Sequence, residues 1–144
     1  MALPPKLAAF LEELSFFTDR QDRIEALVAI GEKYRKPDGV PRDQQHRVPG
    51  CESEVYVSSE PAGEGLNFKI AVDNPQGISA MALAQILDDT LSGEPLELVA
   101  QVQPDVIYEI FGRELSMGKS MGLMNTVSAV KAEASRRLSA GRPD

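Results

Sequence analysis

Two stretches of alternating side chains in the middle of the chain constrain its fold more than any other feature. Within residues 53–59, Val55 and Val57 alternate with polar residues, and within 66–72 every second residue is a large apolar side chain. This period of two is typical of a strand with one buried face. The turn-rich segment 60–65 between them has the length of a hairpin loop. We therefore expect an antiparallel hairpin with one apolar face that other elements must cover.

Apolar residues recur every three or four positions on both sides of this hairpin. Such spacing places side chains on one face of a helix. The stripes are Leu7, Phe10, Leu11 and Leu14; Ile24, Leu27, Val28, Gly31 and Tyr34; Met81, Leu83, Ile86, Leu87 and Leu91; Leu96, Leu98 and Val99; Val106, Ile107, Ile110 and Phe111; and Leu123, Val127, Val130, Ala134 and Leu138. We expect two helices before the hairpin and several after it.

Residues that favour helix ends punctuate these stripes. Pro5 suits a first helical turn, and Thr18 with Gln21 forms a capping box before the second helix. Lys36-Pro37 is expected to stop this second helix, and Ser79 is expected to cap the third. The predicted helix boundaries therefore coincide with the ends of the stripes.

The order of these elements predicts the fold class. A helix pair, then strands, then several helices is typical of an α+β protein with helices on one face of a small antiparallel sheet. Because a two-stranded sheet is marginal by itself, we expect about three strands, with the third formed by residues just before Pro49. No internal repeat or low-complexity tract divides the 144 residues, so we expect one domain over residues 1–144.

Charge and hydropathy bound the function. With 15 Lys and Arg against 22 Asp and Glu, the formal net charge is −7 and no basic cluster offsets it, which argues against a nucleic-acid partner. No apolar run approaches the roughly 20 residues of a membrane span, and the first residues lack a basic region followed by an apolar one. We expect no membrane partner and a cytoplasmic protein. A single cysteine, which forms no intramolecular disulfide, fits a reducing compartment.

Cys51, the only cysteine, stands where a loop meets the first strand. Pro49 has no backbone N–H and Gly50 has no Cβ, so the chain can turn sharply here and present Cys51 at a loop tip. The preceding linker, residues 37–49, carries only two strongly apolar side chains, Val40 and Val48. We expect too little burial to anchor this linker, which would make it a flexible approach to the thiol.

The segment Pro-Gly-Cys-Glu-Ser-Glu-Val-Tyr at residues 49–56 resembles the Gly-Cys-x-Ser-x-Val-aromatic motif of the SufE family, and the order of elements is similar over nearly the whole chain. The resemblance implies a SufE/IscU-like fold and a sulfur carrier that accepts a persulfide sulfur on Cys51. It also implies a SufS-like cysteine desulfurase as the donor, which the carrier stimulates, and an iron–sulfur cluster scaffold as the recipient. Pyridoxal phosphate is expected on the desulfurase only. The carrier itself is expected to be a monomer or weak homodimer without a cofactor.

Residues around the thiol are candidates for binding the partner or tuning the sulfur. Besides Cys51 as the reacting group, they are Gly50, Glu52, Ser53, His46, Arg47, Asp73 and Lys119. Positive charge from Arg42, His46 and Arg47 favours a thiolate, whereas Glu52 and Glu54 oppose it.

Two of these positions depart from the family pattern. Lys119 stands where the family usually has arginine, and lysine offers a point charge in place of a forked contact. Asp73 opens an Asp-Asn-Pro-Gln-Gly turn where the family often has an acidic-Ser-Asp-Ala run. Both departures bear on how the partner is recognised, not on the chemistry of the thiol.

Other interpretations of the same residues stay open. Cys51 can be a small buried hydrophobe, since free cysteine is often buried. The chain can also be a stand-alone thiol enzyme, such as a one-cysteine peroxidase, or a binding module that does not use the thiol. Disulfide isomerisation within one chain is excluded because it uses two cysteines. We favour an accessory sulfur-transfer protein over an independent enzyme.

Nucleotide and metal sites have weak support in the sequence. Gly118-Lys119-Ser120 lacks the upstream glycine of a phosphate loop and has no strand leading into it. One cysteine and one histidine are too few for a structural zinc site, which needs four ligands drawn mainly from these two types. We expect neither a nucleotide nor a metal.

Overall fold

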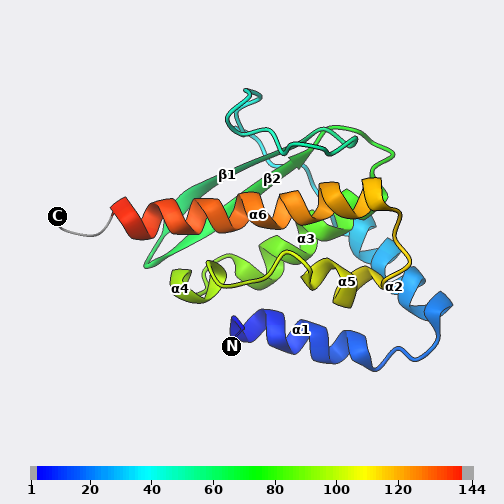
Figure 1. Ribbon diagram of the computed structural model, residues 1–144. Coiled ribbons are helices and arrows are strands. Elements are labelled where there is room, and N and C mark those ends of the chain that lie inside the picture. The colour runs from blue at the N-terminus through cyan, green and yellow to red at the C-terminus, as the bar shows by residue number, and fades with distance from the viewer. Residues whose placement is uncertain (1–2, 141–144) are drawn as a thin grey trace.

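The structure, a computed structural model, describes residues 3–140 (Figure 1). Its elements are α1 (Pro5–Ser15), α2 (Arg20–Lys33), β1 (Val55–Ala62), β2 (Gly65–Val72), α3 (Ile78–Leu91), α4 (Leu96–Val99), α5 (Val106–Phe111) and α6 (Met117–Ala140). A helix pair, a hairpin and a run of helices follow one another in the predicted order. The α+β class is confirmed.

The hairpin buries one face, as its alternation predicts. β1 and β2 are antiparallel, and Val57 of β1 lies opposite Ile70 of β2 with both side chains 3% exposed. Gly63-Glu64 makes the two-residue turn between the strands, where Gly63 adopts a φ of +62°. A two-residue turn suits the right-handed twist of the strands when its first central residue takes positive φ, which glycine does at no steric cost.

The expectation of a third strand was wrong. The described sheet has two strands, and the residues before Pro49 add one isolated antiparallel bridge, between Arg47 and Tyr56. Val57 N donates to His46 O at 2.9 Å beside this bridge. A turn at 43–46 and the proline at 49 leave only two residues between them, which is too short a segment for a strand.

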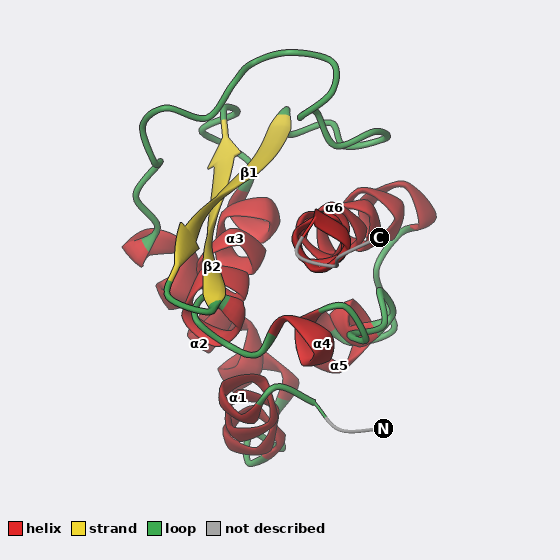
Figure 2. Cartoon of the chain, turned by 90° about the vertical axis from the view of Figure 1, so that its left-hand side faces the viewer, coloured by secondary structure: helices red, strands yellow, loops and turns green. Residues whose placement is uncertain are grey.

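The helices cover the apolar face of the hairpin. α3 packs against β2 and α6 packs against β1, while α1 and α2 pack on α3 (Figure 2). The largest fully buried side chains come from the helices, the hairpin and the loops between them: Leu7, Leu83, Ile86, Leu87, Leu91, Ile107, Ile110, Val48, Val55, Val99, Val102 and Val127. No helix within residues 3–140 combines the length and apolar character that crossing a bilayer requires.

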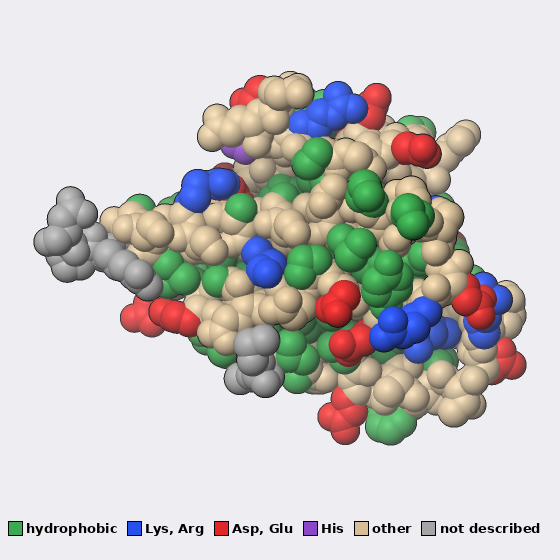
Figure 3. Space-filling view, viewed as in Figure 1, with side chains coloured by type: hydrophobic (Ala, Val, Ile, Leu, Met, Phe, Trp, Pro, Cys, Tyr) green, Lys and Arg blue, Asp and Glu red, His purple; other side chains and the backbone are tan. Residues whose placement is uncertain are grey.

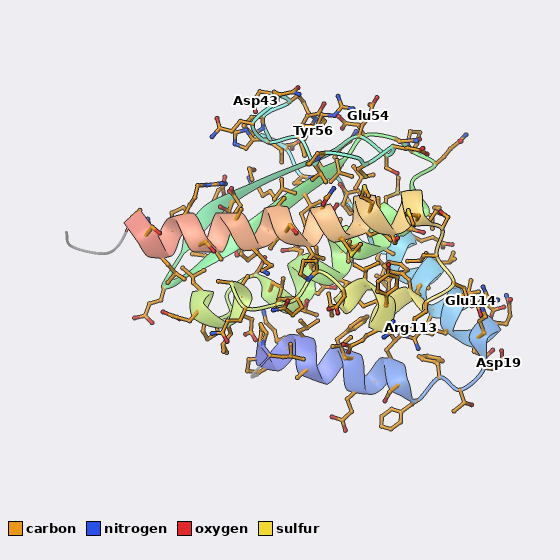
Figure 4. All side chains as sticks on the ribbon, viewed as in Figure 1. Asp19, Asp43, Glu54, Tyr56, Arg113 and Glu114 are labelled. Atoms are coloured by element: carbon orange, nitrogen blue, oxygen red, sulfur yellow. The ribbon has the colours of Figure 1, made fainter. Side chains whose placement is uncertain are left out.

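The linker before the thiol is anchored more firmly than its composition suggests. Both of its large apolar residues are buried, with Val40 5% and Val48 1% exposed. Arg42 donates to the two carboxylate oxygens of Asp73 at 2.9 Å each, and its guanidinium lies 5.4 Å from the centre of the Tyr56 ring. Figure 4 shows Tyr56 at this edge of the molecule, beside the linker. The expectation that two apolar residues would not anchor the linker was wrong, because both side chains are buried in the fold.

Two helix caps lie one or two residues from the predicted positions. Asp19, not Thr18, caps α2, and its carboxylate accepts a hydrogen bond from Gln21 N at 2.7 Å. Gly77, not Ser79, is the N-cap of α3, and no side chain caps that helix. Since aspartate and threonine are both good N-caps, adjacent candidates are hard to separate by sequence.

α2 is shorter and more exposed than its stripe predicts. It ends at Lys33 because Tyr34 is extended, with a ψ of 135°, and does not continue to Lys36-Pro37. Ile24 and Val28 are 40% and 37% exposed. The helix lies at the periphery, so the narrower strip that faces α3 is the part that becomes buried.

Candidate functional site

The loop that carries Cys51 has a fixed base. Val48 N donates to Val55 O at 2.8 Å, and Asn74 N donates to Ser53 O at 3.1 Å. Between these two backbone bonds the chain doubles back, and Cys51 lies half-buried against the hydrophobic core as a free thiol. The thiol therefore sits on a short loop joined rigidly to the start of β1.

Two residues in the left-handed region bracket this loop. Gly50, directly before the cysteine, has a φ of +68°. Glu54 has a φ of +54° and is the one non-glycine residue with positive φ among residues 3–140 (Figure 4). Such a backbone costs a residue with a Cβ about 1–3 kcal/mol, and strain of this kind clusters at functional sites.

A cavity of about 400 Å³ opens beside the thiol. Its walls are the cysteine loop, the turn after β2 with the start of α3, and the first turns of α6. The lining residues are Cys51, Glu52, Ser53, Asn74, Gln76, Gly77, Ile78, Ser79, Ala80, Ser116, Gly118, Lys119, Gly122 and Leu123. Three segments that are far apart in the sequence thus line one cavity together with Cys51.

Two glycines allow these segments to approach closely. A Cβ on Gly122 of α6 would lie 3.1 Å from Cys51 Cα, so the helix backbone touches the loop directly. A Cβ on Gly77 would lie 2.6 Å from Ser53 Oγ and 2.9 Å from Ser53 Cβ. Real Cβ contacts are longer than this, so any larger residue at position 77 has to displace the loop two residues after the cysteine.

The charge distribution of the cavity favours an anion. The first residues of α3 and α6 line it, and the amino end of a helix carries partial positive charge. Lys119 adds a cation that forms no ion pair within the described part of the chain. Glu52 is the only acidic residue in the lining. An anion that enters the cavity therefore meets the first residues of two helices and one lysine side chain.

Two of the other predicted cations, Arg42 and His46, are paired with acidic residues outside the cavity. Arg42, with Lys36, binds Asp73, and the hydrogen bond from Arg42 is the main reason why the pKa of Asp73 lies below its usual value. His46 Nδ1 lies 2.6 Å from Asp43 Oδ1, and this contact holds the pKa of Asp43 below its usual value as well. Neither pair lines the cavity.

The structure brings together part of the predicted set. Cys51, Glu52, Ser53 and Lys119 all line the cavity, and Gly50 adjoins it through the peptide bond to the cysteine. His46 and Arg47 line a separate groove, and Asp73 lies outside both.

Gly77, Gly122 and Asn125 shape the site although no sequence motif points to them. Gly77 and Gly122 make the close approaches described above, and Asn125 Nδ2 donates a hydrogen bond to Pro49 O at 2.9 Å. No local pattern marks these residues, because their partners are 24 to 76 positions away along the chain.

The described residues do not form the arrangement of a metal site or of a phosphate loop. Within residues 3–140 no three His, Cys, Asp or Glu side chains gather as a metal site would require. Gly118, Lys119 and Ser120 belong to the first turn of α6, which follows the short helix α5 and not a strand. A phosphate loop is instead entered from a strand.

The fold and the site define a small α+β protein with one loop-borne thiol at a cavity. The family model described as "Fe-S metabolism associated domain", the SufE family, matches residues 8–134. The chain belongs to the SufE family, which is associated with iron–sulfur metabolism.

Known proteins agree with this assignment. The chain is 25% identical to an uncharacterised SufE-like protein of Rhizobium etli, with 93% of each chain covered. It is also 25% identical to the chloroplastic/mitochondrial SufE-like protein 1 of Arabidopsis thaliana, where the match covers 92% of this chain and 35% of the plant protein. A hypothetical protein of Thermus thermophilus has the same fold, with a TM-score of 0.73 at 23% identity over 96% of this chain and 99% of that one.

Proposed function

We propose that this protein is a persulfide-accepting sulfur carrier that works with a SufS-like cysteine desulfurase and stimulates it. Cys51 takes the sulfur and passes it to an iron–sulfur cluster scaffold. The observation that carries the proposal is the single thiol on a short loop beside an anion-favouring cavity. Membership in the SufE family supports the link to iron–sulfur metabolism.

The transfer step follows thiol–disulfide exchange. The Cys51 thiolate attacks the terminal sulfur of the donor's cysteine persulfide, so a new S–S bond forms at Cys51 while the S–S bond on the donor breaks. The donor persulfide reacts in its protonated form and its cysteine leaves as a thiolate. The proton stays on the transferred sulfur and is lost to water when the new persulfide ionises. No external oxidant or reductant is needed, because one persulfide replaces another. Removal of its persulfide frees the desulfurase for another turnover, which is how a carrier stimulates it.

The cavity supports this chemistry in two ways. Its open volume of about 400 Å³ leaves space beside the thiol for an additional sulfur atom. A persulfide is more acidic than a thiol and is an anion at neutral pH, so the helix starts and Lys119 stabilise the loaded form. The same walls exclude part of the solvent, which protects a reactive sulfur from oxidation.

The test is incubation of the protein with a cysteine desulfurase and cysteine, followed by mass spectrometry of the Cys51 peptide. We expect one added sulfur atom that a reducing agent removes, together with faster desulfurase turnover. Cys51→Ser is the matched control, since it should stay folded and neither gain sulfur nor stimulate the enzyme. If no cognate desulfurase loads Cys51, the proposal is wrong. Catalytic consumption of hydrogen peroxide by the protein alone would instead favour a one-cysteine peroxidase.

A further inference from the structure

The base and the tip of the cysteine loop are held by different kinds of contact. At the base, main-chain bonds join Val48 to Val55, Ser53 to Asn74 and Glu54 to Asp73. At the tip, one side-chain hydrogen bond reaches residues 49–54 from another element, in which Asn125 Nδ2 of α6 donates to Pro49 O at 2.9 Å. The tip can therefore be released without breaking the base.

The bond to Asn125 lies where it can control the cysteine. Pro49 is two residues before Cys51, and the peptide group that accepts the bond leads directly into Gly50 with its φ of +68°. The amide nitrogen of Asn125 must face Pro49, because a backbone carbonyl only accepts hydrogen bonds. As long as the bond holds, the entry to the left-handed turn is fixed against α6.

The helix surface around Asn125 shapes the same contact. Gly122, one turn earlier on α6, has no side chain to separate the helix from Cys51, and Met121 approaches Gly50 from the neighbouring position. Met121 is 49% exposed, so this packing closes only one side of the loop. Figure 3 shows hydrophobic side chains on the surface over α6 and the shorter helices beside it. The loop thus rests on α6 through weak apolar contacts and one directional bond.

The Asn125 bond is also accessible from outside. Pro49 and Asn125 line a groove of about 260 Å³ that lies next to the thiol cavity and is separate from it. The groove includes Ser128, one turn further along α6, which is exposed and donates no hydrogen bond within the described residues. A polar group of a partner protein that enters this groove can compete for Asn125 without touching the sulfur.

We propose that Asn125 is a positioning residue that latches the cysteine loop onto α6 and keeps the thiol turned toward the cavity. Release of the Asn125–Pro49 bond lets the segment from Pro49 to Glu52 swing away from α6 and exposes Cys51 to a donor. This role rests on the proposed function, because only a carrier that meets a second protein needs to expose its thiol.

The test measures alkylation of Cys51 by iodoacetamide in the free protein, without a desulfurase. Asn125→Ala removes the donor, and Asn125→Asp keeps the shape while it replaces the amide nitrogen with an acceptor that repels Pro49 O. We expect alkylation to be about three- to tenfold faster in both variants, the factor that one ordinary hydrogen bond contributes. Ser128→Ala is the matched control and should leave the rate unchanged.

A pH profile of the rate separates a latch from a change in thiol chemistry. Release of the loop raises the plateau rate at high pH, where the thiol is fully ionised, whereas a change in the electrostatic environment alone moves the midpoint of the profile and leaves the plateau in place. Thermal unfolding of each variant is followed in parallel. If one variant fails to fold, the other decides the outcome. Plateau rates within about 1.5-fold of the unaltered protein in a folded variant would overturn the latch.

A desulfurase arm keeps this inference distinct from the proposed function. With a limiting amount of donor enzyme, released variants should load sulfur on Cys51 faster than the unaltered protein. If alkylation accelerates but no protein gains sulfur from any cognate desulfurase, the latch is supported and the carrier function is refuted. If sulfur loading occurs but Asn125 variants match Ser128→Ala in both assays, the carrier stands and the latch does not.

Discussion

Replacement of Gly77 by alanine tests how tightly the turn after β2 packs against the cysteine loop. Gly77 has a φ of −81° and a ψ of 63°, an inverse γ-turn conformation that residues with a Cβ also adopt, so the main penalty has to come from contacts of the new methyl group. That group would lie 2.6 Å from Ser53 Oγ and 2.9 Å from Ser53 Cβ. Rotation of the hydroxyl relieves the first contact, but only a backbone shift relieves the second.

The expected magnitude follows from these distances. Overpacking of a well-packed contact costs about 1–3 kcal/mol. Alanine recovers about 0.4–1 kcal/mol of this by restricting the unfolded chain. We therefore expect Gly77→Ala to lower the free energy of unfolding by about 1.3 kcal/mol, the difference between the midpoints of those two ranges.

A double-mutant cycle with Ser53 gives the assay, with urea unfolding as the measurement. Ser53→Ala removes only the hydroxyl, so it should relieve part of the penalty of Gly77→Ala, and Ser53→Gly removes both clashing atoms and should relieve most of it. The free energy of unfolding of the double variant Gly77→Ala with Ser53→Gly should exceed the value expected from adding the two single changes by about 1–3 kcal/mol, which is the cost of overpacking. A coupling energy within about 0.5 kcal/mol of zero, the usual limit of additivity, would show that the two residues do not touch.

Two further predictions concern the frame around the site. Tyr34→Phe should lower the free energy of unfolding by about 1–3 kcal/mol, because the hydroxyl donates to Ile70 O at 2.7 Å and accepts from Val72 N at 2.9 Å, and both groups lose a partner. The control in urea unfolding is Tyr108→Phe, since the Tyr108 hydroxyl has no hydrogen bond among the described residues. An equal loss of stability in both variants would contradict the prediction. Asp73→Asn should be less stable than the unaltered protein at pH 7, and the difference should shrink as the pH falls below about 4, the pKa of an aspartate in the unfolded chain. Arg42, then Lys36, lowers the pKa of Asp73 in the folded state, so its stabilisation is present above the unfolded pKa and is lost as the pH falls through the folded one; a stability gap that persists unchanged at low pH would refute this assignment.

Much of the fold could be predicted because its signals are local. The stripe on α1 correctly places Leu7 and Leu14 in the core, and the stripe on α6 does the same for Val127 and Val130. Hairpin alternation succeeded for the same reason, since neighbours two positions apart decide which face is buried. Local periodicity did not predict the number of strands. The segment before Pro49 forms only the bridge at Arg47, because a turn precedes it and the proline follows it.

The candidate site was predictable only at its centre. Cys51 is conspicuous because it is the only cysteine and follows a Pro-Gly pair. Its surroundings depend on contacts across the fold, such as Asn125 with Pro49 at a separation of 76 residues, which no spacing rule can indicate. Closeness in sequence can also mislead. Arg42 was expected to bring positive charge to the thiol, but it is paired with Asp73.

Two kinds of hydrogen bond hold the cysteine loop, and they determine which part of it can move. The main-chain bonds at Val48 and Ser53 continue the pairing of the hairpin and are expected to open only when the sheet itself does. The side-chain bond from Asn125 is solvent-exposed and can exchange with water or a partner at little cost. Motion is therefore confined to a segment of about four residues, of which Gly50 is the one residue without a Cβ. Such a short segment moves its thiol a limited distance, so the function proposed above requires the donor's persulfide to approach on a flexible element of its own.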